Sequence, residues 1–241
     1  MVKTLSMSPS RHLSDFLNYL AATTNGEAGD ITSSNLPSIN EISKALGVSV
    51  ASVREQLEVA KALGLVEVRP RTGIRRLPYE FSPAVQQSLS YALESDPGCF
   101  EAFSDLRNHV EASYWYQAVR ALTPEDRQEL QALTARAREK LLGTPIQIPH
   151  QEHRQLHIII YGRLNNVFVQ GILEAYWDAY EAVGLNVFTD YNYLQKVWTF
   201  HQNMVDAIDS GDYVSGYEAL IEHMDLIYQR PQQKPTTESK R

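Results

Sequence analysis

The spacing of hydrophobic residues predicts a small, mainly helical domain at the start of the chain. Apolar residues recur every three to four positions over about 10–23, which is typical of one buried helix face. The polar stretch 25–35 that follows predicts a loop. The apolar residues of the first helix face are Leu13, Phe16, Leu17 and Leu20.

Two further helices separated by a short turn are predicted next. Ser38 and Glu41 have the spacing of a capping box, which predicts a helix start. Gly47 suits a helix end, where a positive φ is common, and Ser49 then suits the N-cap of a second helix. That second helix is predicted to end near Gly64.

A β-hairpin is predicted to complete this domain. Residues 66–68 alternate in polarity, 70–73 form a turn with proline and glycine, and 74–77 return as a second strand. Helix, helix, turn, helix and hairpin together are the order of a winged helix-turn-helix. We therefore predict such a domain over residues 1–77.

The rest of the chain has helical periodicity with regular breaks at glycine and proline. We predict an all-α bundle of about seven helices over residues 78–230 and a disordered polar tail over 231–241. The fold class is thus mainly α with one small β-hairpin. The predicted helices lie near 82–94, 99–121, 124–142, 147–162, 165–183, 191–209 and 212–229.

Composition excludes several classes of protein. The single cysteine, Cys99, allows no intrachain disulfide, and no apolar run approaches the roughly 18 residues of a membrane span. No secretory signal is visible at the N-terminus. We expect a cytoplasmic protein that does not contact a membrane.

The net charge of −7 is distributed unevenly between the two predicted domains. Residues 1–77 hold nine basic and seven acidic side chains, whereas the remainder holds 13 basic and 22 acidic ones. Four arginines also fall within eight positions of the predicted hairpin. The asymmetry indicates two units with different partners, and the arginines of the predicted wing suit double-stranded DNA as the partner of the first.

The predicted DNA-contacting residues lie near the starts of the two capped helices and on the wing. Hydroxyl groups suit phosphates, and Arg54 suits either a phosphate or a guanine edge. The alternative is a small α/β domain with a solvated basic loop. The candidates are Ser38, Asn40, Ser49, Val50, Ala51, Ser52, Arg54, Arg71, Thr72, Gly73 and Arg75.

Five segments of this domain resemble the signature of the GntR superfamily of dimeric bacterial transcription regulators. They are 36–42, 46–49, 53–57, 64–66 and the wing glycine Gly73. The resemblance implies that Arg54 contacts DNA and that the protein is a homodimer. Asn40 and Val50 stand where the superfamily commonly has arginine, which implies a different operator sequence.

Histidines are concentrated in the second domain. His153 and His157 are four residues apart and so share one helix face. His201 and His223 lie ten and twelve residues from Gly211, so they can face each other across a helical hairpin. Converging imidazoles form a typical divalent metal site, with zinc or nickel favoured by nitrogen ligands. The alternative is four histidines with separate hydrogen bonds.

The second domain resembles the ligand-binding domain of the fatty-acid-regulator (FadR) branch of the superfamily. The resemblance implies that the four histidines bind a metal and that Arg107 and Glu111 contribute to an effector site for a small carboxylate. His153 stands where the branch has a metal-binding carboxylate. The matching residues are Asp105, Arg107, Glu111, His157, Asn165, His201 and His223.

We therefore expect a ligand-responsive transcription regulator that binds DNA as a dimer and is not an enzyme. One alternative is a regulator without metal that binds an acyl chain. Another is a metalloenzyme, because an open histidine site can activate water. No glutamate is clearly placed as its general base, since Glu152 is predicted to point away from the face of His153.

Overall fold

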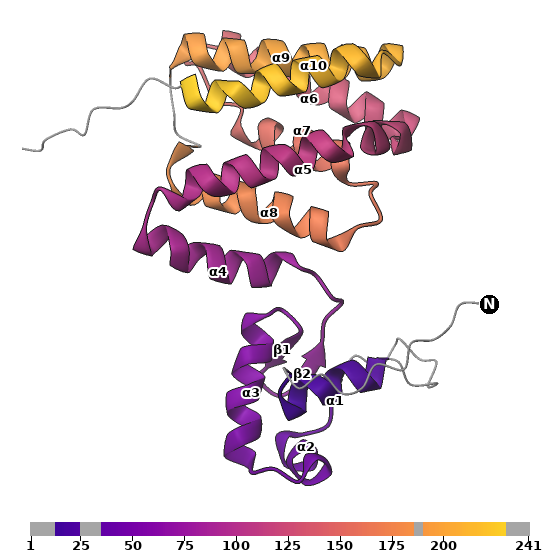
Figure 1. Cartoon of the computed structure of the whole chain (residues 1–241), viewed down its shortest axis with the longest axis vertical. Helices are drawn as coiled ribbons and strands as arrows, with labels where there is room; N and C mark the ends of the chain where they lie inside the picture. The colour runs from indigo at the N-terminus through magenta and orange to yellow at the C-terminus, as the bar shows by residue number, and fades with distance from the viewer. Residues whose placement is uncertain (1–12, 25–34, 186–189, 230–241) are drawn as a thin grey trace, which may run out of the picture. The chain divides into compact units, whose positions relative to one another are not determined.

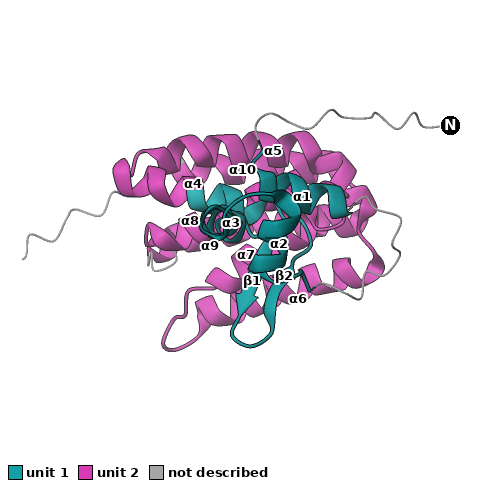
Figure 2. Cartoon of the chain, turned by 90° about the horizontal axis from the view of Figure 1, so that it is seen from below, with its two compact units in different colours: residues 1–87 teal, residues 88–241 magenta. Residues whose placement is uncertain are grey.

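A computed structural model describes residues 13–24, 35–185 and 190–229. The chain divides into two compact units, residues 1–87 and 88–241 (Figure 2). The predicted disordered tail, 231–241, and all but the last residue of the predicted loop 25–35 lie outside the described residues.

The first unit has the predicted order of elements (Figure 1). Three helices precede two antiparallel strands that pair Val66 with Arg76 and Arg69 with Gly73. Asn35 forms an isolated bridge with Arg75 beside the hairpin. This is a winged helix-turn-helix, as the sequence predicts. Its elements are α1 (Asp15–Thr24), α2 (Ile39–Leu46), α3 (Val50–Ala62), β1 (Val66–Arg69) and β2 (Gly73–Arg76).

The predicted helix boundaries of this unit are confirmed by their hydrogen bonds. Ser38 and Glu41 form a capping box at the start of α2. Gly47 ends α2 in the left-handed region with φ of 68°, where a residue without a Cβ is favoured. The Ser49 side chain accepts from the backbone N–H of Ser52 and caps α3. The turn between α2 and α3 is therefore set by local sequence.

One apolar core holds the first unit together. Each helix and each strand contributes at least one buried side chain, so the wing is fixed to the helices through this core. A buried core of this size stabilises a small domain mainly by removing apolar area from water. Its members are Phe16, Leu20, Ile42, Val53, Leu57, Ala60, Val66 and Ile74.

Seven helices follow the wing in the described residues, as the sequence predicts (Figure 1). The helix α4 spans the division between the two units, and a short 3₁₀ turn, Leu226–Gln229, follows the last helix. No helix of the described part of the chain has the length and apolar character of a membrane span. The seven are α4 (Ser82–Ser95), α5 (Cys99–Ala121), α6 (Pro124–Leu142), α7 (His150–Tyr161), α8 (Val167–Ala182), α9 (Tyr191–Ser210) and α10 (Tyr213–Asp225).

The bundle packs its helices around a large core that includes Trp115 and Met204. The α9–α10 hairpin is the most extensive helix pair, and Gly211 closes it with φ of 78°. Helix α6 packs on α9 and α7, while α5 packs on α7, α8 and α10. Side chains of α5, α7, α9 and α10 therefore meet in the bundle interior.

Helix α6 is held at its start by Asp126. Thr123 and Asp126 form a capping box, and Asp126 also accepts two hydrogen bonds from Arg163, at 2.8 and 2.9 Å. Hydrogen bonding by Arg163 is the largest cause that lowers the pKa of Asp126 to about 2, opposed by partial burial. This carboxylate thus connects the start of α6 to the end of α7.

We predict that Asp126→Asn lowers the stability of the bundle by about 1–2 kcal/mol at pH 7, since a cap and a bidentate pair are weakened. The folded-state pKa is depressed, so this contribution is present above the unfolded value of 3.8 and is lost as pH falls toward 2. Thermal unfolding of wild type and variant measures it. The exposed Asp105→Asn is the control, and equal melting of all three proteins at pH 7 would contradict the assignment.

Candidate functional site

Four histidines from three helices converge in the bundle interior. His153 and His157 lie on α7, His201 on α9 and His223 on α10. One ring nitrogen from each of the four histidines can be chosen so that all four nitrogens lie within 4.8 Å of one another. We call this group the histidine cluster. Three of its members are buried, and only His153 is partly exposed.

The geometry of the histidine cluster fits a single metal ion. Nε2 of His157 and Nε2 of His201 are 3.1 Å apart. Two nitrogens bound to one ion at about 2.0–2.1 Å lie roughly 3.0–3.4 Å apart, so this spacing matches a shared ion. The Nε2 atoms of the two rings therefore face each other as two ligands of one ion would.

A buried ion pair orients His157 from the side opposite His201. Nδ1 of His157 lies 3.1 Å from Oε1 of Glu111 and 3.0 Å from Nη2 of Arg107. Nε of Arg107 contacts the same Glu111 oxygen at 3.0 Å. An ionised carboxylate only accepts hydrogen bonds, so Nδ1–H of His157 donates to Glu111 and leaves the Nε2 lone pair for a metal.

The charge of Glu111 is maintained by its neighbours. Burial alone would raise the pKa of Glu111, but the charge of Arg107 and the hydrogen bond from His157 outweigh burial and lower it below its usual value. Arg107 also lies over the Tyr176 ring, with Cζ 4.5 Å from the centroid, and donates from Nη1 to Asn108. Arg107 and Glu111 therefore lie beside the histidine cluster as a fully buried pair.

Burial favours the neutral form of the His157 and His201 imidazoles. Burial is the largest cause that lowers the pKa of His157, and Arg107 adds to it although Glu111 opposes it. Burial also lowers the pKa of His201 well below its usual value, and the neighbouring His223 and His153 lower it further. Neutral rings keep the lone pairs that a metal requires.

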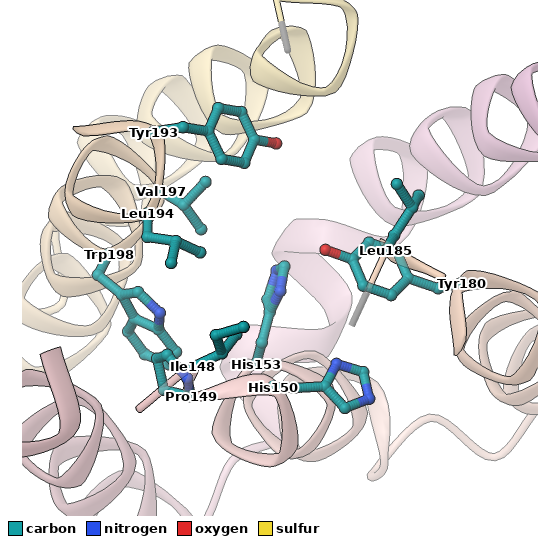
Figure 3. Close-up of a pocket in the computed structure, with 10 residues that line it drawn as sticks. All are labelled: Ile148, Pro149, His150, His153, Tyr180, Leu185, Tyr193, Leu194, Val197 and Trp198. Atoms are coloured by element: carbon teal, nitrogen blue, oxygen red, sulfur yellow. The ribbon is translucent and has the colours of Figure 1, made fainter. Parts of the chain in front are cut away.

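A small cavity lies beside the histidine cluster. His153 points into it between Trp198 of α9 and Tyr180 of α8 (Figure 3). Its volume is about 20 Å³, enough for about one water molecule. Leu194 and Val197 of α9 make part of its wall apolar. His153 is therefore the member of the histidine cluster that lines this cavity.

Two neighbours of the cluster were not predicted from the sequence. Trp177 of α8 packs edge-on against His153, with ring centroids 4.6 Å apart. His150 lines the cavity, and it precedes His153 and His157 by three and seven residues. This spacing repeats on one helix face and was the available signal for His150. Nothing in the local sequence indicates Trp177, which comes from another helix.

Glu152 points away from the cluster, as predicted. Its carboxylate is buried and pairs with Nζ of Lys140 on α6, 2.6 Å from Oε1. The pair connects α6 with α7. In the described residues no carboxylate joins the four histidines as a further ligand.

In the first unit, the start of α3 presents the predicted base-reading side chains. Ser49, Ala51 and Arg54 are exposed, whereas Val50 is half-buried. Ser52 is also half-buried, and its hydroxyl accepts from Nε2 of Gln56. Ser38 and Asn40 are exposed at the start of α2. This surface has the placement of a recognition helix.

Two arginines of the wing pair with one carboxylate. Glu67 pairs with Arg69, at 3.0 Å, and with Arg75. Arg71 at the tip is exposed and has φ of 68°, beside the exposed Thr72 and Gly73. Basic side chains on an exposed hairpin suit phosphates or the minor groove.

A winged helix-turn-helix joined to a helical bundle with a histidine cluster in its interior has the organisation of a DNA-binding transcription regulator with an effector-binding domain. Residues 102–226 match the FCD domain and residues 32–75 match the bacterial regulatory proteins of the gntR family. The chain belongs to the gntR-family regulators that carry an FCD domain. It is thus a transcription regulator and not the metalloenzyme considered as an alternative.

Two comparisons agree with this membership. The chain is 25% identical over 228 residues to the putative L-lactate dehydrogenase operon regulatory protein of Escherichia coli K12, across 91% of this chain and 84% of the relative. A solved structure of Streptococcus agalactiae GntR has a TM-score of 0.62 at 16% identity, across 89% of this chain and 96% of that one. The second comparison concerns the fold alone.

Proposed function

We propose that this protein is a cytoplasmic, homodimeric regulator whose DNA binding responds to a small carboxylate bound at a metal ion in the bundle. The observation that carries the proposal is the histidine cluster, which holds four ring nitrogens within 4.8 Å of one another beside a cavity. His153, His157, His201 and His223 would hold the ion. The metal would supply a positive centre to which a carboxylate oxygen binds.

The charge of the site supports an anionic effector. Four neutral imidazoles leave a divalent ion with its full charge of about +2. The nearest carboxylate, Glu111, is already paired with Arg107 at 3.0 Å and does not offset that charge. In this proposal Arg107 and Glu111 contribute to the effector site through their contacts with Nδ1 of His157.

Nitrogen ligands favour a late first-row metal. Imidazole suits zinc and nickel, whereas magnesium and calcium prefer oxygen ligands. The cluster consists of histidines alone in the described residues. We therefore propose zinc or nickel as the resident metal.

Dimerisation is proposed from the DNA-binding domain. One recognition helix reads too few base pairs for useful specificity, so two copies would bind a short pseudo-palindrome. The proposed contacts are the exposed residues at the starts of α2 and α3 and at the wing. The E. coli relative is named as a regulator of an L-lactate dehydrogenase operon, and this agrees with control of carboxylate metabolism.

The alternative of an acyl-chain pocket without metal has less support. The cavity beside His153 has a volume of about 20 Å³, and a long acyl chain needs several hundred. A metal-bound carboxylate of two to four carbons requires a smaller movement of the lining side chains.

The test is a DNA-binding assay with metal-free and zinc- or nickel-loaded protein, using the promoter of its own gene as probe. We expect one ion per chain, a dimeric complex, and an affinity for DNA that changes when small carboxylates are added to the loaded protein only. Absence of bound metal together with no thermal shift on adding zinc or nickel would overturn the metal-dependent part. A strictly monomeric protein at micromolar concentration would overturn the dimer.

A further inference from the structure

His150 is a polar side chain of the cavity that the metal site does not use. It is the first residue of α7 and lines the same cavity as His153 (Figure 3). Its Nδ1 is buried and has no hydrogen-bond partner among the described residues. A buried nitrogen of this kind costs free energy unless a ligand supplies the missing partner.

The other nitrogen of His150 is held by a carboxylate. Nε2 of His150 lies 2.8 Å from Oε1 of Glu181, which also accepts from Nη1 of Arg154 at 3.2 Å. The hydrogen bond from His150 is the largest cause that lowers the pKa of Glu181, so this side chain is ionised. Because an ionised carboxylate only accepts, Nε2 of His150 carries the hydrogen. In the neutral ring, Nδ1 is then an acceptor with an unused lone pair.

The ring of His150 is also fixed in orientation. It stacks on Tyr180, with the planes 6° apart and the centroids 5.7 Å apart. One face is therefore covered and one edge is bound to Glu181. The acceptor edge keeps a defined direction, as a group that selects between similar ligands requires.

We infer that His150 determines effector specificity by accepting a hydrogen bond from a hydroxyl group, so that the effector is a small hydroxycarboxylate. The inference rests on the proposed function, because the carboxylate of the ligand binds at the metal. A plain carboxylate offers no donor to Nδ1. A 2-oxo acid offers a further acceptor, which leaves two lone pairs facing each other.

An amino acid also carries a donor, but its charge does not suit the site. Its ammonium group would lie near a divalent ion, and like charges repel strongly where water is excluded. A neutral hydroxyl avoids this cost. The charge of the site therefore favours the hydroxy acid over the amino acid.

The experiment measures binding to zinc-loaded, full-length protein by calorimetry with matched sets of small acids. One set is acetate, glycolate, glyoxylate and glycine, and the other is propionate, lactate, pyruvate and alanine. We expect the hydroxy acid of each set to bind at least about 3–10-fold more tightly than the other three, the range of one neutral hydrogen bond.

Two variants separate the contribution of His150 from metal chelation, since a hydroxyl also improves chelation. His150→Phe keeps a ring on Tyr180 but has no acceptor, so the preference for the hydroxy acid should fall by about 3–10-fold while one zinc per chain remains. Glu181→Ala, at a half-exposed side chain, removes the carboxylate that keeps the hydrogen on Nε2 of His150. Nδ1 is then an acceptor in only part of the molecules, so the preference for the hydroxy acid should fall in part. His109→Phe, an exposed histidine of α5, is the matched control and should match wild type.

The outcomes distinguish the two hypotheses. If carboxylates bind but the preference is the same in wild type and His150→Phe, the role of His150 is wrong and the proposed function stands. Tighter binding of glycine than glycolate would overturn the hydroxyl assignment. If no acid binds to zinc-loaded wild type, the carboxylate effector itself is wrong and this inference with it.

Discussion

His201→Ala is expected to abolish stoichiometric metal binding and the thermal stabilisation that added zinc or nickel gives. His201 is fully buried, its Nε2 lies 3.1 Å from that of His157, and its ring centroid is 4.3 Å from that of His223. Its removal takes away a central ligand of the cluster. A metal bound only by the folded protein at 100 times its dissociation constant stabilises it by about 2.7 kcal/mol.

The readout is the difference in melting temperature with and without metal, because a buried histidine replaced by alanine also leaves a cavity. Metal analysis after purification without chelator gives the stoichiometry. His109→Ala, at an exposed position of α5, should retain one ion per chain. One equivalent of tightly bound metal in His201→Ala would show that the cluster does not hold the ion.

His153→Asp complements this variant. It places an oxygen ligand where the cluster has its only partly exposed imidazole, so metal should be retained. The added negative charge lowers the charge of the site by one and should weaken binding of an anionic probe such as lactate. Loss of metal in this variant would mean that the fourth ligand must be a nitrogen.

Arg54→Ala is expected to weaken binding to the operator by about 1–3 kcal/mol, a factor of roughly 5–150, if Arg54 reads a base edge. Arg54 is exposed on the second turn of α3, one residue after the buried Val53 that anchors the helix. The substitution leaves that core contact in place. The change should therefore affect DNA binding and not folding.

The measurement compares the operator with a random duplex at one salt concentration, because phosphate contacts depend strongly on salt. A larger loss on the operator than on random DNA indicates base reading, whereas equal losses mean a phosphate contact. Arg136→Ala, which removes an exposed arginine from α6, is the control for net charge. Unchanged affinity for both duplexes in Arg54→Ala would exclude this face of α3 from the DNA interface.

Local sequence was sufficient to predict most of the fold. The caps at Ser38, Ser49 and Thr123 and the left-handed Gly47 and Gly211 act within a few residues, so their sequence pattern carries the full physical cause. The resulting helices leave few ways to bury their apolar faces. A winged domain followed by a helical bundle could therefore be predicted without tertiary information.

The candidate site could be predicted only in part. Helical spacing places His153 and His157 on one face, and hairpin length places His201 opposite His223. The pairing of Glu111 with His157 joins residues 46 positions apart, and Arg107 reaches His157 across 50. Such contacts depend on how helices pack, and neither periodicity nor capping contains that information. The pairing of Glu67 with Arg69 and Arg75 could likewise not be predicted, because it depends on the register of the two strands.

The small cavity beside His153 has a thermodynamic consequence for the proposed regulator. A space of about 20 Å³ admits about one water, so a carboxylate must bind a conformation in which the lining side chains have moved apart. The apparent affinity then equals the intrinsic affinity multiplied by the fraction of molecules already in that conformation. Packing residues such as Leu194 and Val197 would set the effector concentration at which DNA binding changes, without coordinating the metal or donating to the ligand. Sensitivity to the effector would thus depend on core packing as much as on the groups that bind it.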